Sequence, residues 1–117
     1  MPDLPSLDSF EITAAELDAL LKENPEAVRL IDCREDDEFG ICKIEGAELL
    51  PLSSFAEKGG PALLKDESKP VVIYCHHGMR SLNATMWLKQ RGRKDVWSLA
   101  GGIDWWSQDI DPEVPRY

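Results

Sequence analysis

Short apolar segments separated by more polar stretches predict that strands and helices alternate along this chain. The segments expected to form strands are residues 10–12, 28–32, 46–50, 71–75 and 95–99. The fourth, Val71-Val72-Ile73-Tyr74-Cys75, is almost continuously hydrophobic. Such a run is typical of a strand buried on both faces in the middle of a parallel sheet.

Capping and periodicity signals predict helices over residues 14–23, 35–39, 53–57, 81–91 and 103–106. Thr13 and Glu16 have the spacing of a capping box at the start of the first helix, and Asn24-Pro25 ends it. Gly59-Gly60-Pro61 is expected to end the third helix. The residues of the fourth helix expected to face the core are Leu82, Met86 and Leu88.

This alternation predicts an α/β fold with a mainly parallel central sheet of about five strands and helices on both faces. The chain has 117 residues, 43% of them hydrophobic, which suits one domain with its own core. Residues 1–9, rich in Pro, Asp and Ser, are expected to form a loose lead-in to a domain spanning residues 10–117. In sheets of this kind, ligands bind at the carboxyl ends of the strands.

Charge and cysteine content narrow the possible partners and the compartment. The chain carries 22 acidic and 13 basic residues, so nucleic acid and anionic membrane surfaces are not expected partners. Its three cysteines have no repeated spacing, and the N-terminus has no basic or apolar leader region. No apolar run approaches the roughly 18 residues of a membrane span. A reducing, cytoplasmic location is therefore expected.

Cys75 ends the most hydrophobic strand and opens a tight loop before the fourth helix. The predicted active-site loop comprises Cys75, His76, His77, Gly78, Met79, Arg80 and Ser81. Unpaired N–H groups at a helix start hold anions and lower the pKa of a thiol. A buried cysteine can simply pack, but this context favours a nucleophile. Arg80 is a cation at the unfavourable end of the helix dipole, which favours a role in binding an anionic donor. Gly78 is expected to supply a positive φ or a close backbone approach.

The two histidines of the loop suggest metal binding or acid–base chemistry. Adjacent side chains in a tight loop usually point in different directions, so His76 and His77 are not expected to bind a metal. We expect them to shape the mouth of the pocket, with a general-acid role as the alternative.

Other polar and sulfur-containing residues are expected to support the fold around the loop. Asp32 and Arg34 follow the second strand and are expected to form an ion pair that braces the neighbouring loop. Cys33 and Cys42 are expected to pack in the core, and a resolving thiol for Cys75 is the alternative for Cys42.

Four blocks of sequence follow one another from about residue 10 to residue 107. They are the strand ending in Asp32-Cys33-Arg34-Glu35, the segment from Glu38-Phe39 to Lys43-Ile44-Glu45-Gly46-Ala47, the loop from Cys75 to Ser81, and the run from Leu99 to Trp106. Their order and spacing resemble a single rhodanese homology domain. Cys42, Lys43 and Glu45 replace the family's usual Gly, His and Pro, outside the nucleophile loop.

The resemblance implies a single rhodanese-like domain that acts as a thiosulfate sulfurtransferase-type enzyme and needs no cofactor. Cys75 would take a sulfane sulfur from thiosulfate or a similar small donor and hold it as a persulfide. A small-molecule acceptor such as cyanide or a thiol, or a protein thiol, would then remove it. Arg80 lies five positions after Cys75, one fewer than in related cell-cycle phosphatases, and the shorter loop favours sulfur over a phosphoryl group.

Two other functions are compatible with the same loop. One is a carrier or binding module that delivers the Cys75 persulfide sulfur only to a protein partner. The other is a small cysteine-dependent phosphatase or arsenate reductase, against which the loop length argues. The sequence carries no signal for an oligomeric state.

Overall fold

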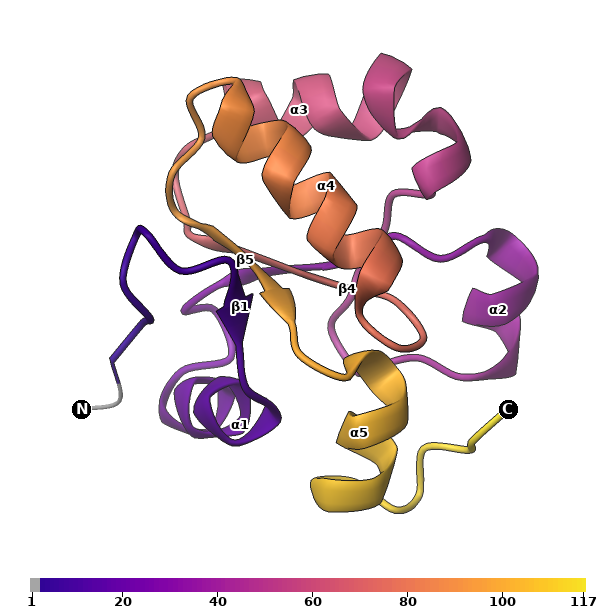
Figure 1. The fold of residues 1–117 in the computed structure, drawn as a ribbon. Coiled ribbons are helices and arrows are strands. Elements are labelled where there is room, and N and C mark those ends of the chain that lie inside the picture. Colours follow the sequence, from indigo (N-terminus) through magenta and orange to yellow (C-terminus); the bar gives the residue numbers. More distant parts are fainter. Residues whose placement is uncertain (1–2) are drawn as a thin grey trace.

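The computed structural model describes residues 3–117 and contains a parallel sheet between two layers of helices (Figure 1). The strands are β1 (Glu11–Ile12), β2 (Arg29–Asp32), β3 (Glu48–Leu49), β4 (Val71–Tyr74) and β5 (Val96–Leu99). Their order in the sheet is β1-β5-β4-β2-β3, and every neighbouring pair is parallel. The predicted α/β fold is confirmed, and the strand that precedes Cys75 lies in the middle of the sheet.

Helices cover both faces of the sheet (Figure 1). They are α1 (Ala14–Glu23), α2 (Asp36–Ile41), α3 (Gly60–Lys65), α4 (Met79–Gln90) and α5 (Gly102–Asp109). Helices α1 and α5 contact each other on one side, and α3 and α4 contact each other on the other side. A 3₁₀ turn (Leu52–Ser54) and a π-helical turn (Phe55–Gly59) lead into α3.

The alternation of side chains along β4 separates two hydrophobic cores. Val72 and Tyr74 belong to the core beneath α1 and α5. Ile73 and Cys75 belong to the core beneath α3 and α4. Because successive strand residues point to opposite faces, the Cys75 side chain is directed to the side of the sheet that α4 covers.

The first helix begins and ends as its sequence predicts. The Glu16 N–H donates to Thr13 Oγ1 at 3.1 Å, and the Thr13 N–H donates to Glu16 Oε1 at 2.8 Å. Asn24 is the C-cap residue. This capping box satisfies two N–H groups that a helix N-terminus otherwise leaves unpaired.

The prediction that Gly59-Gly60-Pro61 ends a helix is wrong, because α3 begins at this segment. Gly59 and Gly60 have ordinary helical φ angles of −64° and −59°. A Cβ at Gly60 would lie 2.5 Å from the Trp87 ring, so glycine is needed here for close packing of α3 on α4. Pro61 lies in the first turn of α3, where its fixed φ suits a helix.

The predicted inward face of α4 is only partly correct. Leu88 is fully buried, Leu82 is half-buried, and Met86 is 40% exposed, so the prediction for Met86 is wrong. The residues of α4 that face the core are Ser81, Ala84, Thr85 and Leu88. Three of them are small, and two of these are polar, so a search for large apolar residues does not identify this face.

The N-terminal lead-in has no helix or strand over residues 3–9, but it is held against the domain. Trp97 Nε1 donates to the Ser6 carbonyl at 3.0 Å, and Lys89 Nζ donates to the Leu7 carbonyl at 2.9 Å. Residues 1–2 of the predicted lead-in lie outside the described residues. Within residues 3–117, no helix has the length and apolar character needed to cross a membrane.

Candidate active site

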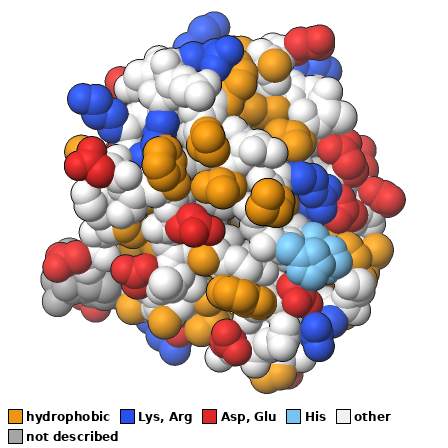
Figure 2. All heavy atoms as spheres, viewed as in Figure 1, with side chains coloured by type: hydrophobic (Ala, Val, Ile, Leu, Met, Phe, Trp, Pro, Cys, Tyr) orange, Lys and Arg blue, Asp and Glu red, His pale blue; other side chains and the backbone are white. Residues whose placement is uncertain are grey.

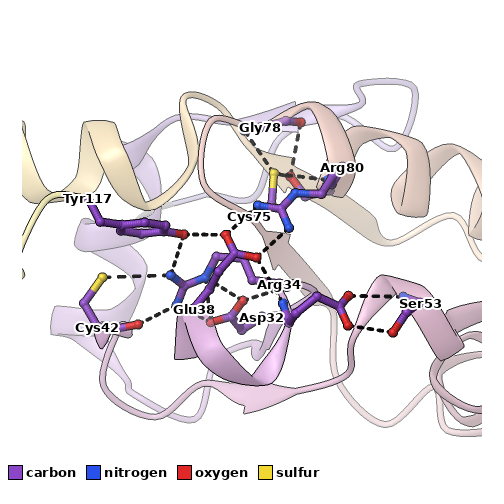
Figure 3. A network of polar contacts seen from close by, with 11 residues as sticks. Asp32, Arg34, Glu38, Cys42, Ser53, Cys75, Gly78, Arg80 and Tyr117 are labelled. Atoms are coloured by element: carbon purple, nitrogen blue, oxygen red, sulfur yellow. Dashed lines mark hydrogen bonds and ion pairs between the residues drawn. The ribbon is translucent and has the colours of Figure 1, made fainter. Parts of the chain in front are cut away.

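The loop between β4 and α4 surrounds the Cys75 sulfur with hydrogen-bond donors (Figure 3). The Gly78 N–H lies 3.1 Å from Sγ, the Ser81 N–H lies 3.4 Å from it, and the Ser81 hydroxyl lies 3.5 Å from it. Gly78 has a φ of +107°, which strongly favours glycine, so its backbone turns its N–H toward the sulfur. The hydrogen-bond donors that an anion-binding loop requires therefore surround the Cys75 sulfur.

These donors favour the thiolate form of Cys75. The neighbouring Cys33 thiol makes the largest contribution that lowers the pKa of Cys75, to about 5. Burial opposes this shift, and the donors on Ser81 and Gly78 add to it. The thiolate is therefore the main form of Cys75 at neutral pH, and it is the form that attacks sulfur. Cys75 is only 1% exposed, so this anion is stabilised by the protein and not by water.

Cys33 is a residue of the site that sequence reasoning assigned to packing alone. In the pairing of β2 with β4, Asp32 is opposite Tyr74, and the Cys33 N–H donates to the Tyr74 carbonyl at 3.0 Å. The next residues along these strands are Cys33 and Cys75, and both side chains belong to the core beneath α3 and α4. The Cys75 sulfur and burial together raise the pKa of Cys33, so Cys33 is a neutral thiol.

Cys42 lies elsewhere, which contradicts the alternative that it resolves Cys75. Its side chain belongs to the core beneath α1 and α5, on the opposite face of the sheet from Cys75. There Arg34 Nη1 approaches Cys42 Sγ at 3.9 Å (Figure 3). Packing, the favoured prediction for Cys42, agrees with this position.

The Arg80 guanidinium is bound by Glu38 of α2, which the sequence did not identify as a site residue. Arg80 Nη1 and Nη2 donate to the two Glu38 carboxylate oxygens at 2.7 and 2.8 Å (Figure 3). This interaction holds the pKa of Glu38 at about 2, well below its ordinary value. The part of Arg80 expected to hold an anionic donor is therefore occupied by a carboxylate, and binding of a donor by Arg80 stays a prediction.

The predicted ion pair between Asp32 and Arg34 is confirmed. Arg34 Nη2 lies 2.6 Å from Asp32 Oδ2, and both side chains are fully buried. Arg34 also donates to the Cys42 carbonyl and to the Tyr117 hydroxyl. Arg34 therefore connects Asp32 at the end of β2 with Cys42 after α2 and with Tyr117.

Tyr117 is a third residue of the site that the sequence did not identify, and it stacks on His76. Its ring lies 3.9 Å from the His76 ring, which in turn stacks on the His77 ring at 3.9 Å. The expectation that the two histidines point in different directions is therefore wrong. The Tyr117 hydroxyl donates to Glu38 at 2.8 Å, so the aromatic stack is connected to the ion pair between Arg80 and Glu38.

The two histidines differ in their surroundings. The His76 Nε2 atom is buried without a hydrogen-bond partner, and burial lowers the pKa of His76. The His77 side chain is 65% exposed, and Figure 2 shows histidine atoms on the surface among acidic and basic side chains. That the two histidines shape the mouth of a pocket stays a prediction. Within residues 3–117, no group of three His, Cys, Asp or Glu side chains is arranged to hold a metal ion.

The remaining loop residues have opposite environments. The Met79 side chain is 69% exposed, whereas Ser81 is buried and its hydroxyl lies 2.7 Å from that of Ser98. A cavity of about 650 Å³ lies elsewhere, beside α1 and α5, and none of the loop residues lines it.

Comparisons with known proteins agree with this geometry. A family model described as a rhodanese-like domain matches residues 13–109. The chain is 33% identical over 90 residues to the chloroplastic rhodanese-like/PpiC domain-containing protein 12 of Arabidopsis thaliana, a match covering 76% of this chain and 30% of that protein. It is 36% identical over 88 residues to the probable adenylyltransferase/sulfurtransferase MoeZ of Mycobacterium tuberculosis, covering 75% of this chain and 22% of that protein. The chain thus spans less than a third of the length of these curated relatives.

Solved structures with the same fold include single-domain proteins of similar size. The crystal structure of a rhodanese-related protein from Thermoplasma volcanium has a TM-score of 0.73 and 30% identity, and the match covers 92% of this chain and 99% of that one. The human single-domain sulfurtransferase has a TM-score of 0.67 and 24% identity, with 85% of this chain and 96% of that chain covered. At this identity, the human protein supports the fold alone.

Proposed function

Because the chain belongs to the rhodanese-like domain family, we propose that it transfers a sulfane sulfur through a persulfide on Cys75. The donor is thiosulfate or a similar small anion, and the acceptor is cyanide, a small thiol or a protein thiol. The observation that carries this proposal is the Cys75 sulfur, which accepts hydrogen bonds from Gly78 and Ser81 and has a pKa of about 5.

In the first step, the Cys75 thiolate attacks the outer sulfur of thiosulfate. The bond between the two sulfur atoms of thiosulfate breaks, sulfite leaves with the electron pair, and a Cys75 persulfide forms. The backbone N–H groups of Gly78 and Ser81 are available to hold the charge that moves to the outer sulfur. A covalent intermediate of this kind divides one transfer into two easier displacements.

In the second step, the acceptor attacks the outer sulfur of the persulfide and Cys75 leaves as a thiolate. A thiol of low pKa is a good leaving group, so the donors that activate Cys75 in the first step also favour its release. No proton has to move at the sulfur in either step. This agrees with the hydrogen bonds of the Cys75 sulfur, which come from Gly78 and Ser81 and from neither imidazole in residues 3–117.

Access to Cys75 requires a change in the side chains around it, because Cys75 is 1% exposed. We propose that the anionic donor competes with Glu38 for Arg80. A sulfonate resembles the carboxylate in charge and in its spacing of oxygen atoms, so the guanidinium can exchange one for the other. Movement of Glu38 away from Arg80 would also affect the Tyr117 hydroxyl, which donates to the same carboxylate.

A turnover assay tests the enzyme against the two other functions. Thiosulfate and cyanide should yield thiocyanate catalytically with the wild-type protein and not with Cys75→Ser, whereas Cys42→Ser should retain activity. A single turnover without catalysis would favour the carrier module. Cys75-dependent hydrolysis of an aryl phosphate without sulfur transfer would favour the phosphatase.

A reducing compartment such as the cytoplasm would keep Cys75 and Cys33 available as thiols.

A further inference from the structure

Cys33 and Cys75 are neighbours across two adjacent strands, although they lie in separate blocks of the sequence. They extend the β2–β4 pairing by one residue beyond Asp32 and Tyr74. Adjacent strands are about 4.8 Å apart. A disulfide requires Cα atoms about 4.4–6.8 Å apart, so the usual spacing of paired strands falls within the Cα range of a disulfide.

The burial of Cys33 favours reaction with the neighbouring Cys75 over reaction with a dissolved reagent. Cys33 is fully buried, so a dissolved reagent cannot reach it directly. Both side chains belong to the core beneath α3 and α4, on the same face of the sheet. Gly78 and Ser81 of the loop donate to the Cys75 sulfur. Cys33 belongs to a different element, because it directly follows β2.

We propose that Cys33 is a second catalytic residue, which resolves the Cys75 persulfide as an intramolecular disulfide and releases hydrosulfide. This inference rests on the proposed function, because it requires the persulfide to form. It gives the bound sulfur a second route: release as free hydrosulfide when no acceptor removes the outer sulfur.

The reaction balances without an external reagent. The Cys33 sulfur attacks Cys75 Sγ, and the bond between Sγ and the outer sulfur breaks. The outer sulfur leaves with the electron pair and takes the Cys33 proton, so an anionic persulfide and a thiol become a disulfide and hydrosulfide. Cys33 is oxidised and the outer sulfur is reduced. Two equivalents of a low-molecular-weight thiol then reduce the disulfide and restore both cysteines.

The test follows the intact mass of the full chain after treatment with thiosulfate and removal of the donor, without any acceptor. The wild-type protein should first gain one sulfur atom, then lose it and end two hydrogen atoms lighter than the reduced chain. Hydrosulfide should appear in step with that change, and a Cys33–Cys75 linked peptide should be found after digestion. Cys42→Ser, in which the other buried cysteine is changed, should behave as the wild type.

In Cys33→Ser, the hydroxyl keeps a hydrogen-bond donor beside Cys75 but cannot form the disulfide. This variant should retain the added sulfur, and its hydrosulfide release should be lost. Cys33→Ala serves as a second variant if the serine protein does not fold. A wild-type persulfide as long-lived as that of Cys33→Ser, with no linked peptide, would overturn this inference and leave the proposed function intact. No gain of sulfur on Cys75 in any variant would overturn both.

Discussion

Arg80 and Glu38 form a bidentate ion pair next to the Cys75 loop, although 42 residues separate them in sequence. The pair joins α4 to α2, and the Tyr117 hydroxyl binds the same carboxylate. A charge pair of this geometry is among the stronger hydrogen-bonded contacts in proteins. Its position means that the cation expected to recognise an anionic donor already has an anionic partner.

Removal of the Glu38 charge should therefore improve donor binding. In Glu38→Gln, we expect the KM for thiosulfate to fall by about threefold to tenfold, equivalent to roughly 0.7–1.4 kcal/mol, with a smaller change in kcat. Asp37→Asn is the matched control, because it removes the same charge from an exposed position of the same helix. An unchanged or higher KM in Glu38→Gln would show that Glu38 does not compete with the donor.

Replacement of Arg80 should weaken the first half-reaction more than the second. Arg80→Ala should lower kcat/KM for thiosulfate by roughly tenfold to a hundredfold, the effect of one lost charge-assisted hydrogen bond of about 1.5–3 kcal/mol. Sulfur release to cyanide from preformed persulfide should change less, which single-turnover kinetics can measure. Arg91→Ala, at the other end of α4, is a control. Donor use equal to that of the wild type would make Arg80 a purely structural residue.

The ionisation of Cys75 should be visible in its alkylation rate. Because the pKa of Cys75 is lowered from 9.0 to about 5, the rate should rise through pH 5 and be level above about pH 6 to 7. Cys33→Ala removes the largest contribution to the lowered pKa of Cys75 and should move the alkylation midpoint to higher pH, whereas Cys42→Ala should not. An alkylation midpoint at the ordinary thiol value would contradict an anion-stabilising loop.

The lowered pKa of Cys75 also predicts a pH dependence of folding stability. The stability that the Cys75 thiolate contributes is complete above pH 9 and is lost as the pH falls toward 5.

The sequence predicts the local features of this site better than it predicts contacts between residues that lie far apart along the chain. The strand–loop–helix pattern identifies Cys75 and Gly78 because their roles depend on a few adjacent residues. The neighbouring position of Cys33 depends on β2 lying beside β4, and strand order is a long-range property that periodicity does not encode. Tyr117 reaches Glu38 across 79 residues, so no local pattern identifies that contact.

The errors within the fold have a similar origin. Gly59-Gly60-Pro61 has the composition of a helix end, but it lies inside a helical run from Leu52 to Lys65. Gly60 is needed there because a side chain at this position would collide with the Trp87 ring. The inward face of α4 was predicted only in part because Ser81 and Thr85 are polar and yet fully buried. In both cases, close packing against a neighbouring element outweighs the local preference of the residue.

The buried ion pair between Asp32 and Arg34 should be sensitive to removal of one partner. Asp32→Asn leaves the Arg34 charge buried without its carboxylate, so we expect the free energy of unfolding to fall by about 3–5 kcal/mol. Glu48→Gln breaks the more exposed pair with Arg29 and should cost about 1 kcal/mol or less. Denaturant unfolding of both variants measures the difference. Similar losses in the two variants would contradict a special role for the buried pair.

The most direct measurement of the central proposal is the intact mass of the protein immediately after brief exposure to thiosulfate, followed by cyanide. We expect a gain of one sulfur atom that maps to Cys75, both in the wild type quenched early and in Cys33→Ser. Cyanide should remove that sulfur stoichiometrically as thiocyanate. Cys75→Ser should gain no sulfur. An unchanged wild-type mass, or a gain that persists in Cys75→Ser, would contradict the assignment of Cys75 as the residue that carries sulfur.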